Sequence, residues 1–285
     1  MLCRFTLALT AFASCAFGDT FTPVTRLQLN DADPNFGGLS ALLMAPDGQS
    51  GTTLSDRGSL FPLVFHRTPD GDLHNIDIGT GQTVATHLGV DEKMDSEALA
   101  RTPSGGLSVG FEQPSRLEVL NPKTMGTAAR HAFPNVQLRS RNKGLEAIAT
   151  HPSGAFTIGL QEVPSKGEDT ITIYALGAES PAPIFQLPVV KDFRVTGADF
   201  GPDGQLYILE RAFSFLGFRT QIRRFDLTSQ NVVPDVIFQS KLGDFDNLEG
   251  ISVWQDSAGK LRISLVSDNN FLSILRSEFV ELVQR

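Results

Sequence analysis

One short pattern recurs five times along this chain, at intervals of about 50 residues. In each copy an apolar strand runs into a turn that contains glycine, and a second strand follows that ends in a carboxylate. Aligned on the second residue of the motif L-E-A or its equivalents, the copies fall at Ser40, Glu97, Glu146, Gly197 and Glu249, with spacings of 57, 49, 51 and 52 residues. Repeats of this length, built from short strands, are typical of a β-propeller with one four-stranded blade per repeat.

The repeat count predicts an all-β propeller of five blades. In the third copy, the expected strands are Leu145–Thr150, Ala155–Leu160, Thr170–Leu176 and Pro183–Leu187. Thr20–Leu29 precedes the first copy, and we expect it to close the ring as the outer strand of the last blade. A sixth, degenerate blade within residues 60–95 stays open as an alternative. The turn Pro69-Asp70-Gly71 nevertheless suits the outer hairpin of the first blade better.

The N-terminus, residues 1–18, resembles a secretion signal. Arg4 supplies positive charge, the apolar stretch 5–17 is too short to span a bilayer, and Ala16-Phe17-Gly18 offers the small residues that a signal peptidase reads. Cleavage before Asp19 predicts a secreted or periplasmic protein whose residues 19–285 form a single propeller domain. The alternative is lipoprotein processing at Cys15, since Ala13-Ser14-Cys15 fits such a site in part.

Cysteine usage and charge disfavour several functions. Both cysteines, Cys3 and Cys15, lie in the signal segment, so the remaining chain has neither a disulfide framework nor thiol chemistry. Without Arg4 the chain carries 23 basic against 32 acidic residues. That balance disfavours nucleic acid, whose binding requires a basic surface. Beyond the signal, no stretch is suited to a transmembrane helix. An acidic protein that handles anions usually does so through bound cations.

The acids of the repeat are expected at one end of the propeller. The two inner strands of a blade are antiparallel, so the start of the first and the end of the second lie at the same mouth of the central channel. The acids at these places are Glu97, Glu146 and Glu249 on the first strands, and Asp56, Glu112, Glu162, Glu210 and Asp268 on the second. Converging carboxylates repel one another unless they are protonated, paired or metal-bound. Because oxygen-only ligands favour a hard cation, the set predicts a Ca²⁺ site.

These residues also have structural interpretations. An acid at a strand end can cap a turn or pair with an arginine, and Arg57, Arg101, Arg116 and Arg211 are close enough in sequence to serve. Asp268-Asn269-Asn270-Phe271 fits an oxygen-rich ligand loop and also an Asx turn. Arg141 and Lys143 precede Gly144 on the loop that enters the same mouth. They either bind a phosphate or carboxylate of a substrate or belong to a solvated loop.

At these residues the chain resembles the secreted bacterial family called phytase-like, or esterase-like activity of phytase. The resemblance covers nearly the whole chain after the signal, in order. It rests on the segments GGLSAL with LSDRG, DSEALA, NKGLEAIA, TGADFGPDGQLYILER, and NLEGISVW with LVSDNNF. The family resemblance implies a β-propeller and calcium-dependent hydrolysis of phosphomonoesters on that scaffold.

The sequence therefore predicts an exported, calcium-dependent phosphoesterase or related ester hydrolase that acts on a small anionic ester. In this hypothesis the acids hold the metal, which binds the substrate anion and polarises the bond to be broken. Glu146 and Glu249 are expected to take part in catalysis, and Arg141, Lys143 and Arg211 to neutralise developing negative charge. The alternative is a non-catalytic propeller in which the metal is structural and the mouth binds a ligand or partner.

Overall fold

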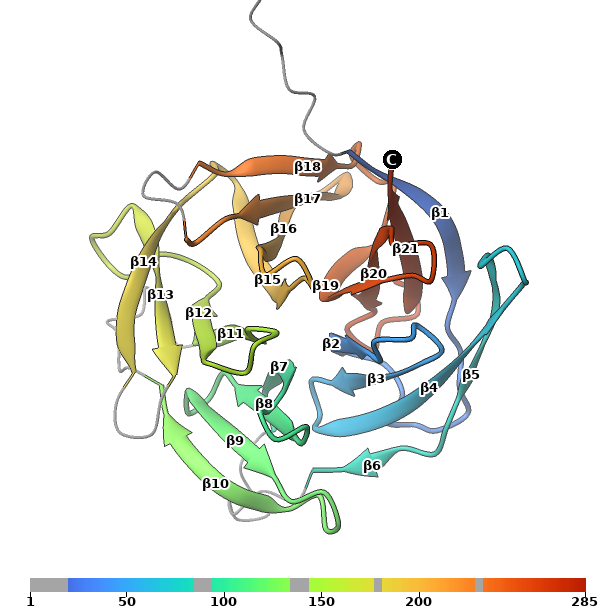
Figure 1. Cartoon of the computed structure of the whole chain (residues 1–285), viewed down its shortest axis with the longest axis horizontal. Coiled ribbons are helices and arrows are strands. Elements are labelled where there is room, and N and C mark those ends of the chain that lie inside the picture. The colour runs from blue at the N-terminus through green and yellow to red at the C-terminus, as the bar shows by residue number, and fades with distance from the viewer. Residues whose placement is uncertain (1–19, 85–93, 134–143, 177–180, 229–232) are drawn as a thin grey trace, which may run out of the picture.

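The chain forms a ring of five antiparallel sheets around a central axis (Figure 1). A computed structural model describes residues 20–84, 94–133, 144–176, 181–228 and 233–285. Within these ranges there are twenty-one strands and no helix, which confirms the predicted five-bladed all-β propeller. None of the described residues therefore belongs to a helix that could cross a membrane.

Each blade has its first strand at the axis and its last at the rim. Blade 1 contains β2 (Leu39–Met44), β3 (Ser50–Ser55), β4 (Ser59–Arg67), β5 (Leu73–Ile78) and the short β6 (Gln82–Thr83). Blade 2 contains β7 (Ser96–Arg101), β8 (Leu107–Phe111), β9 (Arg116–Leu120) and β10 (Thr127–Ala132). Blade 3 contains β11 (Leu145–Thr150), β12 (Thr157–Gln161), β13 (Thr170–Leu176) and β14 (Ala182–Pro188).

The last two blades contain the longest inner strands of the ring. Blade 4 contains β15 (Phe193–Phe200), β16 (Leu206–Ser214), β17 (Gly217–Phe225) and β18 (Asp235–Gln239). Blade 5 contains β19 (Asn247–Gln255), β20 (Leu261–Asp268), β21 (Glu278–Gln284) and, at the rim, β1 (Phe21–Gln28).

Both ends of the chain meet in blade 5. β1 pairs antiparallel with β21, with Phe21 opposite Gln284 and Gln28 opposite Glu278. The N-terminal strand thus closes the ring as predicted. The alternative of a sixth blade is wrong for the described part of residues 60–95, because β5 and β6 both pair with β4. The turn at Pro69 joins β4 to β5 within blade 1.

The turns between the two innermost strands depend on glycine. In all five blades the turn glycine has φ between +66° and +84°, a conformation that side-chain-bearing residues rarely adopt: Gly48, Gly105, Gly154, Gly204 and Gly259. A hydrogen bond from the glycine N–H to the carbonyl three residues earlier closes each turn. These turns lie at one end of the channel, so the starts of the first strands and the ends of the second strands lie at the other.

The hydrophobic core is divided among the five interfaces between neighbouring blades. Five clusters of buried side chains each join two adjacent blades, including the pair of blades 5 and 1 that closes the ring. Blade 4 illustrates why, since Leu206 and Ile208 pack toward blade 3, while Tyr207 and Leu209 pack toward blade 5. Successive residues of a strand point to opposite faces, so both faces of each sheet are buried. Each fully buried Leu or Ile stabilises the fold by roughly 1.5–3 kcal/mol.

Candidate functional site

A β-bulge at the start of every innermost strand determines which side chains surround the channel mouth. In each blade one residue of the first strand has no partner on the second strand, and pairing resumes at the next residue. The unpaired residues are Ser40, Glu97, Glu146, Thr196 and Glu249. Bulges redirect the side chain of the extra residue. The three glutamates line one narrow channel with a volume of about 10 Å³. That is roughly room for one water, so the channel itself is too narrow for a larger ligand.

The ends of the second strands form another ring beside the bulges. The last paired residue of the second strand lies opposite the residue that precedes the bulge. In blades 1 to 5 this last paired residue is Ser55, Phe111, Gln161, Glu210 and Ser267. The next residue along the chain therefore takes the place at the mouth: Asp56, Glu112, Glu162, Arg211 or Asp268. Four blades supply an acid there, whereas blade 4 supplies a cation.

The prediction that Glu210 belongs to this ring is wrong by one residue. Glu210 is buried between strands, where its carboxylate accepts hydrogen bonds from Arg223 Nε at 2.7 Å, Arg223 Nη2 at 2.5 Å and Gln221 Nε2 at 2.9 Å. A slip of one residue along a strand exchanges the face on which every side chain lies. The same slip affects the first strand, where Thr196 and not Gly197 takes the bulge position.

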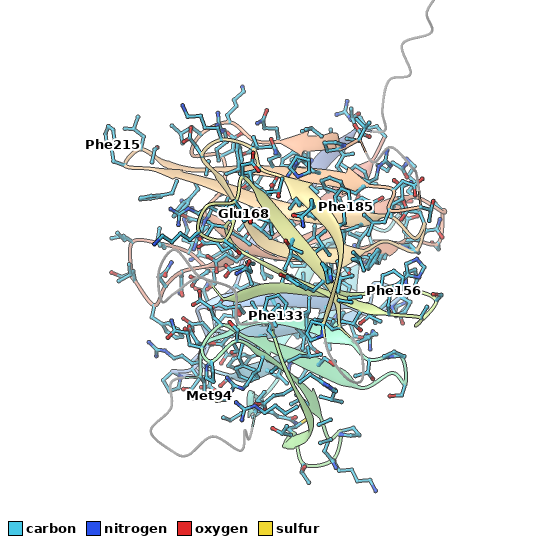
Figure 2. The ribbon with its side chains drawn as sticks, turned by 90° about the vertical axis from the view of Figure 1, so that its left-hand side faces the viewer. Met94, Phe133, Phe156, Glu168, Phe185 and Phe215 are labelled. Atoms are coloured by element: carbon cyan, nitrogen blue, oxygen red, sulfur yellow. The ribbon has the colours of Figure 1, made fainter. Side chains whose placement is uncertain are left out.

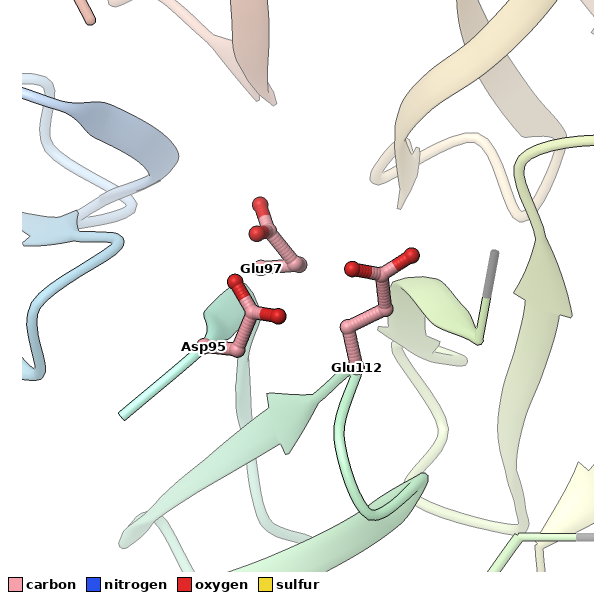
Figure 3. Close-up of side chains that lie close together, drawn as sticks. All are labelled: Asp95, Glu97 and Glu112. Carbon is pink, nitrogen blue, oxygen red and sulfur yellow. The ribbon is translucent and has the colours of Figure 1, made fainter. Parts of the chain in front are cut away.

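The tightest carboxylate group lies in blade 2. Asp95, Glu97 and Glu112 each contribute an oxygen, and these oxygens lie within 4.8 Å of one another. Figure 3 shows the three side chains converging from the start of β7 and the end of β8. Among the ion pairs of the described residues, none involves these three acids. The Gly144 N–H donates to Glu112 Oε1 at 3.0 Å, and a Cβ at Gly144 would collide with the Glu112 carbonyl.

Asp95 is a site residue that the sequence analysis missed. It stands two residues before Glu97, the place that Asn247 occupies before Glu249. The corresponding residues in blades 1 and 3 are Gly38 and Gly144, which have no side chain. Comparing this position among the five repeats, in addition to the strand ends, would have identified Asp95.

Burial and mutual repulsion raise the pKa values of several of these carboxyls. Burial raises the pKa of Glu97 well above its ordinary value, and the charges of Glu146 and Glu249 raise it further. Burial, followed by Glu162 and Glu249, acts in the same way on the pKa of Glu146. Burial also raises the pKa of Glu112 to about 7, although the Gly144 hydrogen bond opposes it. Such perturbed acids gathered at a concave site are typical of functional sites.

The acids of blades 1 and 5 behave similarly. Burial raises the pKa of Asp56 to about 6, with Arg57 opposing and Glu249 adding to the shift. The pKa of Asp268 is raised to about 8, again first by burial and then by Glu249. Asp268 Oδ1 accepts a hydrogen bond from the Asn270 N–H at 2.5 Å. The segment 268–271 therefore makes the backbone contacts of an Asx turn, while Asp268 still faces its acidic neighbours.

Arg211 is the cation at the centre of the opposite side of the mouth. Its Nη1 donates to Glu249 Oε1 and to Asn247 Oδ1, and the Asn247 amide donates to Glu249 Oε1 at 2.9 Å. Burial alone would lower the pKa of Arg211, but Glu249, Glu146 and Glu162 outweigh it and raise the pKa above its ordinary value. For Glu249, burial raises the pKa and Arg211 lowers it, with a net rise.

A second arginine of blade 4 stands beside the mouth and was also missed. Arg194 lies two residues before the bulge residue Thr196, and its Nη1 donates to Glu162 Oε1 at 3.2 Å. The alternative that a strand-end acid pairs with an arginine therefore holds for Glu162 and Glu249. The predicted substrate-binding residues Arg141 and Lys143 lie outside the described residues.

The donor chemistry of the mouth suits a hard cation better than a soft one. All candidate ligands are carboxylate oxygens, and three of them converge without an ion-pair partner among the described residues. A divalent cation would offset the repulsion that raises their pKa values. Oxygen-only donors of this kind are those of Ca²⁺ sites. The residues present thus fit the predicted metal, and Arg211 and Arg194 fit an anion beside it.

Comparison with known proteins gives a family and a fold. The family model described as "Phytase-like: Esterase-like activity of phytase" matches residues 34–271, a range that contains every acid of the mouth. Among solved structures, the chain is similar to one described as a candidate gluconolactonase, with a TM-score of 0.51 and 10% sequence identity over 94% of each chain. At that identity the likeness concerns the fold alone. No curated protein matches the sequence.

Proposed function

Because this chain belongs to the phytase-like family, we propose that it is a metal-dependent ester hydrolase with its active site at the acidic mouth. Its substrates are small anionic esters of phosphoric or carboxylic acid. The observation that carries the proposal is the convergence of acids from four blades on the one mouth where blade 4 supplies arginines. The acids are Asp56, Asp95, Glu97, Glu112, Glu146, Glu162, Glu249 and Asp268.

Asp95, Glu97 and Glu112 would hold the cation, proposed to be Ca²⁺, with Glu146 as their nearest addition across the channel. When bound, such a cation acts as a Lewis acid on an ester oxygen. Binding must displace protons from carboxyls whose pKa values are raised, so affinity for the metal increases with pH. In this proposal Glu249 and Arg211 do not bind the cation and lie where the substrate binds.

The chain's own residues can bind the substrate anion and move protons. Arg211 and the half-exposed Arg194 stand at the same side of the mouth and offer guanidinium groups to a phosphate or carboxylate. Asp268, with a pKa of about 8, can exchange a proton near neutral pH. A general acid or base works best when its pKa lies near the working pH.

Export to the periplasm or outside the cell is part of the same proposal. It rests on the composition of residues 1–18, which supply the charged, apolar and small-residue regions of a secretion signal. The test is N-terminal sequencing of the protein recovered from the periplasm or medium, which should begin at Asp19.

The activity is tested by release of p-nitrophenol from p-nitrophenyl phosphate and p-nitrophenyl acetate. Protein stripped of metal is compared with added Ca²⁺ and with excess EGTA. Turnover should require Ca²⁺ and fall by about 100-fold or more in Glu146→Gln, in line with the loss of a catalytic charge. Asp70→Asn, which removes an exposed acid on the turn between β4 and β5, is the matched control and should keep full activity.

A non-catalytic binding propeller is the second candidate. It is favoured by the engagement of Arg211 Nη1 with Glu249 and Asn247, since these two contacts already occupy part of the guanidinium. If Ca²⁺-loaded protein binds the metal tightly yet hydrolyses none of the esters, this second function replaces the first.

A further inference from the structure

The mouth has an apolar wall on the side of blade 4. The hairpin of β16 and β17 stays paired up to Ser214 and Gly217, three residues beyond Arg211, whereas β12 of blade 3 ends at Gln161. At the hairpin tip the side chains are strongly exposed, with Phe213 at 70% and Phe215 at 92%. Figure 2 shows Phe215 and Phe156 at opposite edges of the molecule. Phe156 belongs to the turn end of the channel, so the apolar tip projects on the side of the acids.

A second segment supplies the facing wall. The loop between β20 and β21 exposes Leu272 at 51% and Ile274 at 83%. Together the hairpin and this loop border a groove of about 1250 Å³. The inner end of the groove contains Arg194, Arg211 and Glu249, so the groove opens directly onto the candidate active site.

The groove changes from charged to apolar along its length. The guanidinium of Arg211 lies 5.8 Å from the centroid of the Phe218 ring, and that ring lies 5.1 Å from the ring of Phe213. An arginine at the inner end is thus continuous with aromatic surface that leads outward. Exposed apolar side chains that gather beside a polar site mark a binding surface rather than ordinary protein surface.

We propose that this groove binds the apolar part of an amphiphilic anion, and that the preferred substrate is an ester with an alkyl or aryl group. The anionic group lies at Arg211 and Arg194, and the hydrocarbon lies along Phe213, Phe215 and Ile274. The identity of the substrate as an ester rests on the proposed function, whereas the binding of the amphiphile does not. The two arginines complement the anionic group, and the exposed apolar side chains complement the hydrocarbon. Glu168, Asp169 and Asp192 also line the groove, so the position of the anionic group is set by the arginines.

Two other occupants fit the charges less well. A second copy of the chain would bring two acidic mouths together, and like charges across an interface oppose association. An anionic lipid surface would be repelled by a chain with a net charge of −8. A small amphiphilic anion reaches the arginines without bringing further acids or an extended negative surface to the mouth.

The test measures binding of non-hydrolysable n-alkylphosphonates, from methyl to octyl, by titration calorimetry in Ca²⁺ buffer. Each added methylene should tighten binding about two- to fourfold while it lies in the groove. The double variant Phe213→Ser/Ile274→Ser should flatten this dependence and leave the affinity for methylphosphonate unchanged. Ile184→Ser, an exposed position on the outer strand β14, is the matched control and should keep the full dependence.

The outcomes separate this inference from the proposed function. A chain-length dependence without any ester hydrolysis supports the groove and removes the hydrolase. Equal affinity for methyl- and octylphosphonate, no binding of either, or a dependence that survives the double variant overturns the inference, even if hydrolysis is found. Should the double variant fail to fold, Phe215→Ser, at the 92% exposed tip, is measured instead. Self-association abolished by the variants, or binding only to phosphatidylglycerol vesicles, would also overturn it in favour of those occupants.

Discussion

The two sides of the mouth use the same strand positions for opposite charges. Three positions of each blade face the mouth: the residue two before the bulge, the bulge residue, and the residue that follows the second strand. In blade 2 these are Asp95, Glu97 and Glu112, three acids without an ion-pair partner among the described residues. In blade 4 the same positions are Arg194, Thr196 and Arg211. The propeller therefore repeats one backbone with its bulge, whereas the charge at the mouth depends on the residues that each blade places there.

The difference divides the tasks of the site. Acids of blade 2 repel one another, and the proposed cation would offset that repulsion. The arginines of blade 4 already have acidic neighbours and border the apolar groove. Removal of a charge should therefore change the free energy of unfolding in opposite directions on the two sides. A change in the same direction would contradict this difference between blades 2 and 4.

The largest effect on stability is expected at Glu210. This residue directly precedes the mouth residue Arg211 in the sequence, but its side chain is buried against Arg223. Glu210→Gln leaves the buried Arg223 without its charged partner, and should lower the free energy of unfolding by about 3–5 kcal/mol. Urea denaturation measures this loss. Calcium affinity should not change, and a variant that stays stable but loses calcium would return Glu210 to the mouth.

Arg211→Met should destabilise the metal-free protein by about 2–3 kcal/mol at pH 8. The change leaves Glu249, Glu146 and Glu162 without the guanidinium that stabilises their charges, in a largely buried setting. At pH 5 the loss should shrink, because Glu249 and Glu146, whose pKa values are raised, can then take up protons. Thermal denaturation at the two pH values gives the comparison, and a loss that does not depend on pH contradicts an electrostatic role for Arg211.

Glu97→Gln should have the opposite sign. In the presence of EGTA it should stabilise the protein by about 1 kcal/mol, since one of several repelling carboxylates is removed. Calcium affinity should fall by at least about tenfold, because the number of charged ligands sets the dissociation constant. Calorimetric titration with Ca²⁺ measures the second effect. If Glu97→Gln and Arg211→Met shift stability in the same direction, the two sides of the mouth are not electrostatically distinct.

A further effect is expected from pH, which acts on several carboxyls at once. Asp56, Glu112 and Asp268 have folded-state pKa values of about 6, 7 and 8, above those of the unfolded chain. Between these values and pH 4 the folded protein binds more protons, so stability of the metal-free protein is greatest near pH 4–5 and declines as pH rises to 8. The melting temperature of the metal-free protein should therefore decrease as the pH rises from 5 to 8.

Calcium should reverse that trend, because it binds the deprotonated carboxylates of the folded state. Melting curves at pH 5, 6.5 and 8, each with Ca²⁺ and with EGTA, measure both directions. A metal-free protein that gains stability as pH rises would contradict the raised pKa values. Melting temperatures indifferent to Ca²⁺ at all three pH values would remove calcium from the proposed function.

The place of most acids at the mouth could be predicted from the sequence, and the misplacement of Glu210 has a clear cause. Asp56, Glu97, Glu112, Glu146 and Asp268 were found because each repeat carries them at strand ends. Blade 4 was aligned on the letters T-G-A, which set Gly197 in the bulge position. Counting eight residues back from the turn glycine gives Ser40, Glu97 and Glu146 in the first three blades, and gives Thr196 in blade 4.

The spacing from the bulge to the strand end identifies the mouth residue of blade 4. Blades 2 and 4 have turns of equal length, with Thr102 hydrogen-bonded to Gly106 and Gly201 to Gln205. In both blades the mouth residue follows the bulge residue by 15 positions, which gives Glu112 after Glu97 and Arg211, not Glu210, after Thr196. Composition of the strands does not distinguish Arg211 from Glu210, since both candidates are charged.

By itself, the sequence determined the number of blades, the closing strand, the glycine turns and the end of the ring where acids gather. These features depend on local turn chemistry and on a period that recurs along the chain. Only the tertiary structure decided that blade 4 turns its arginines to the mouth, and that Phe213 and Ile274 border the same groove. Both depend on pairing across strands and on closure of the ring, which bring together residues that no local pattern connects.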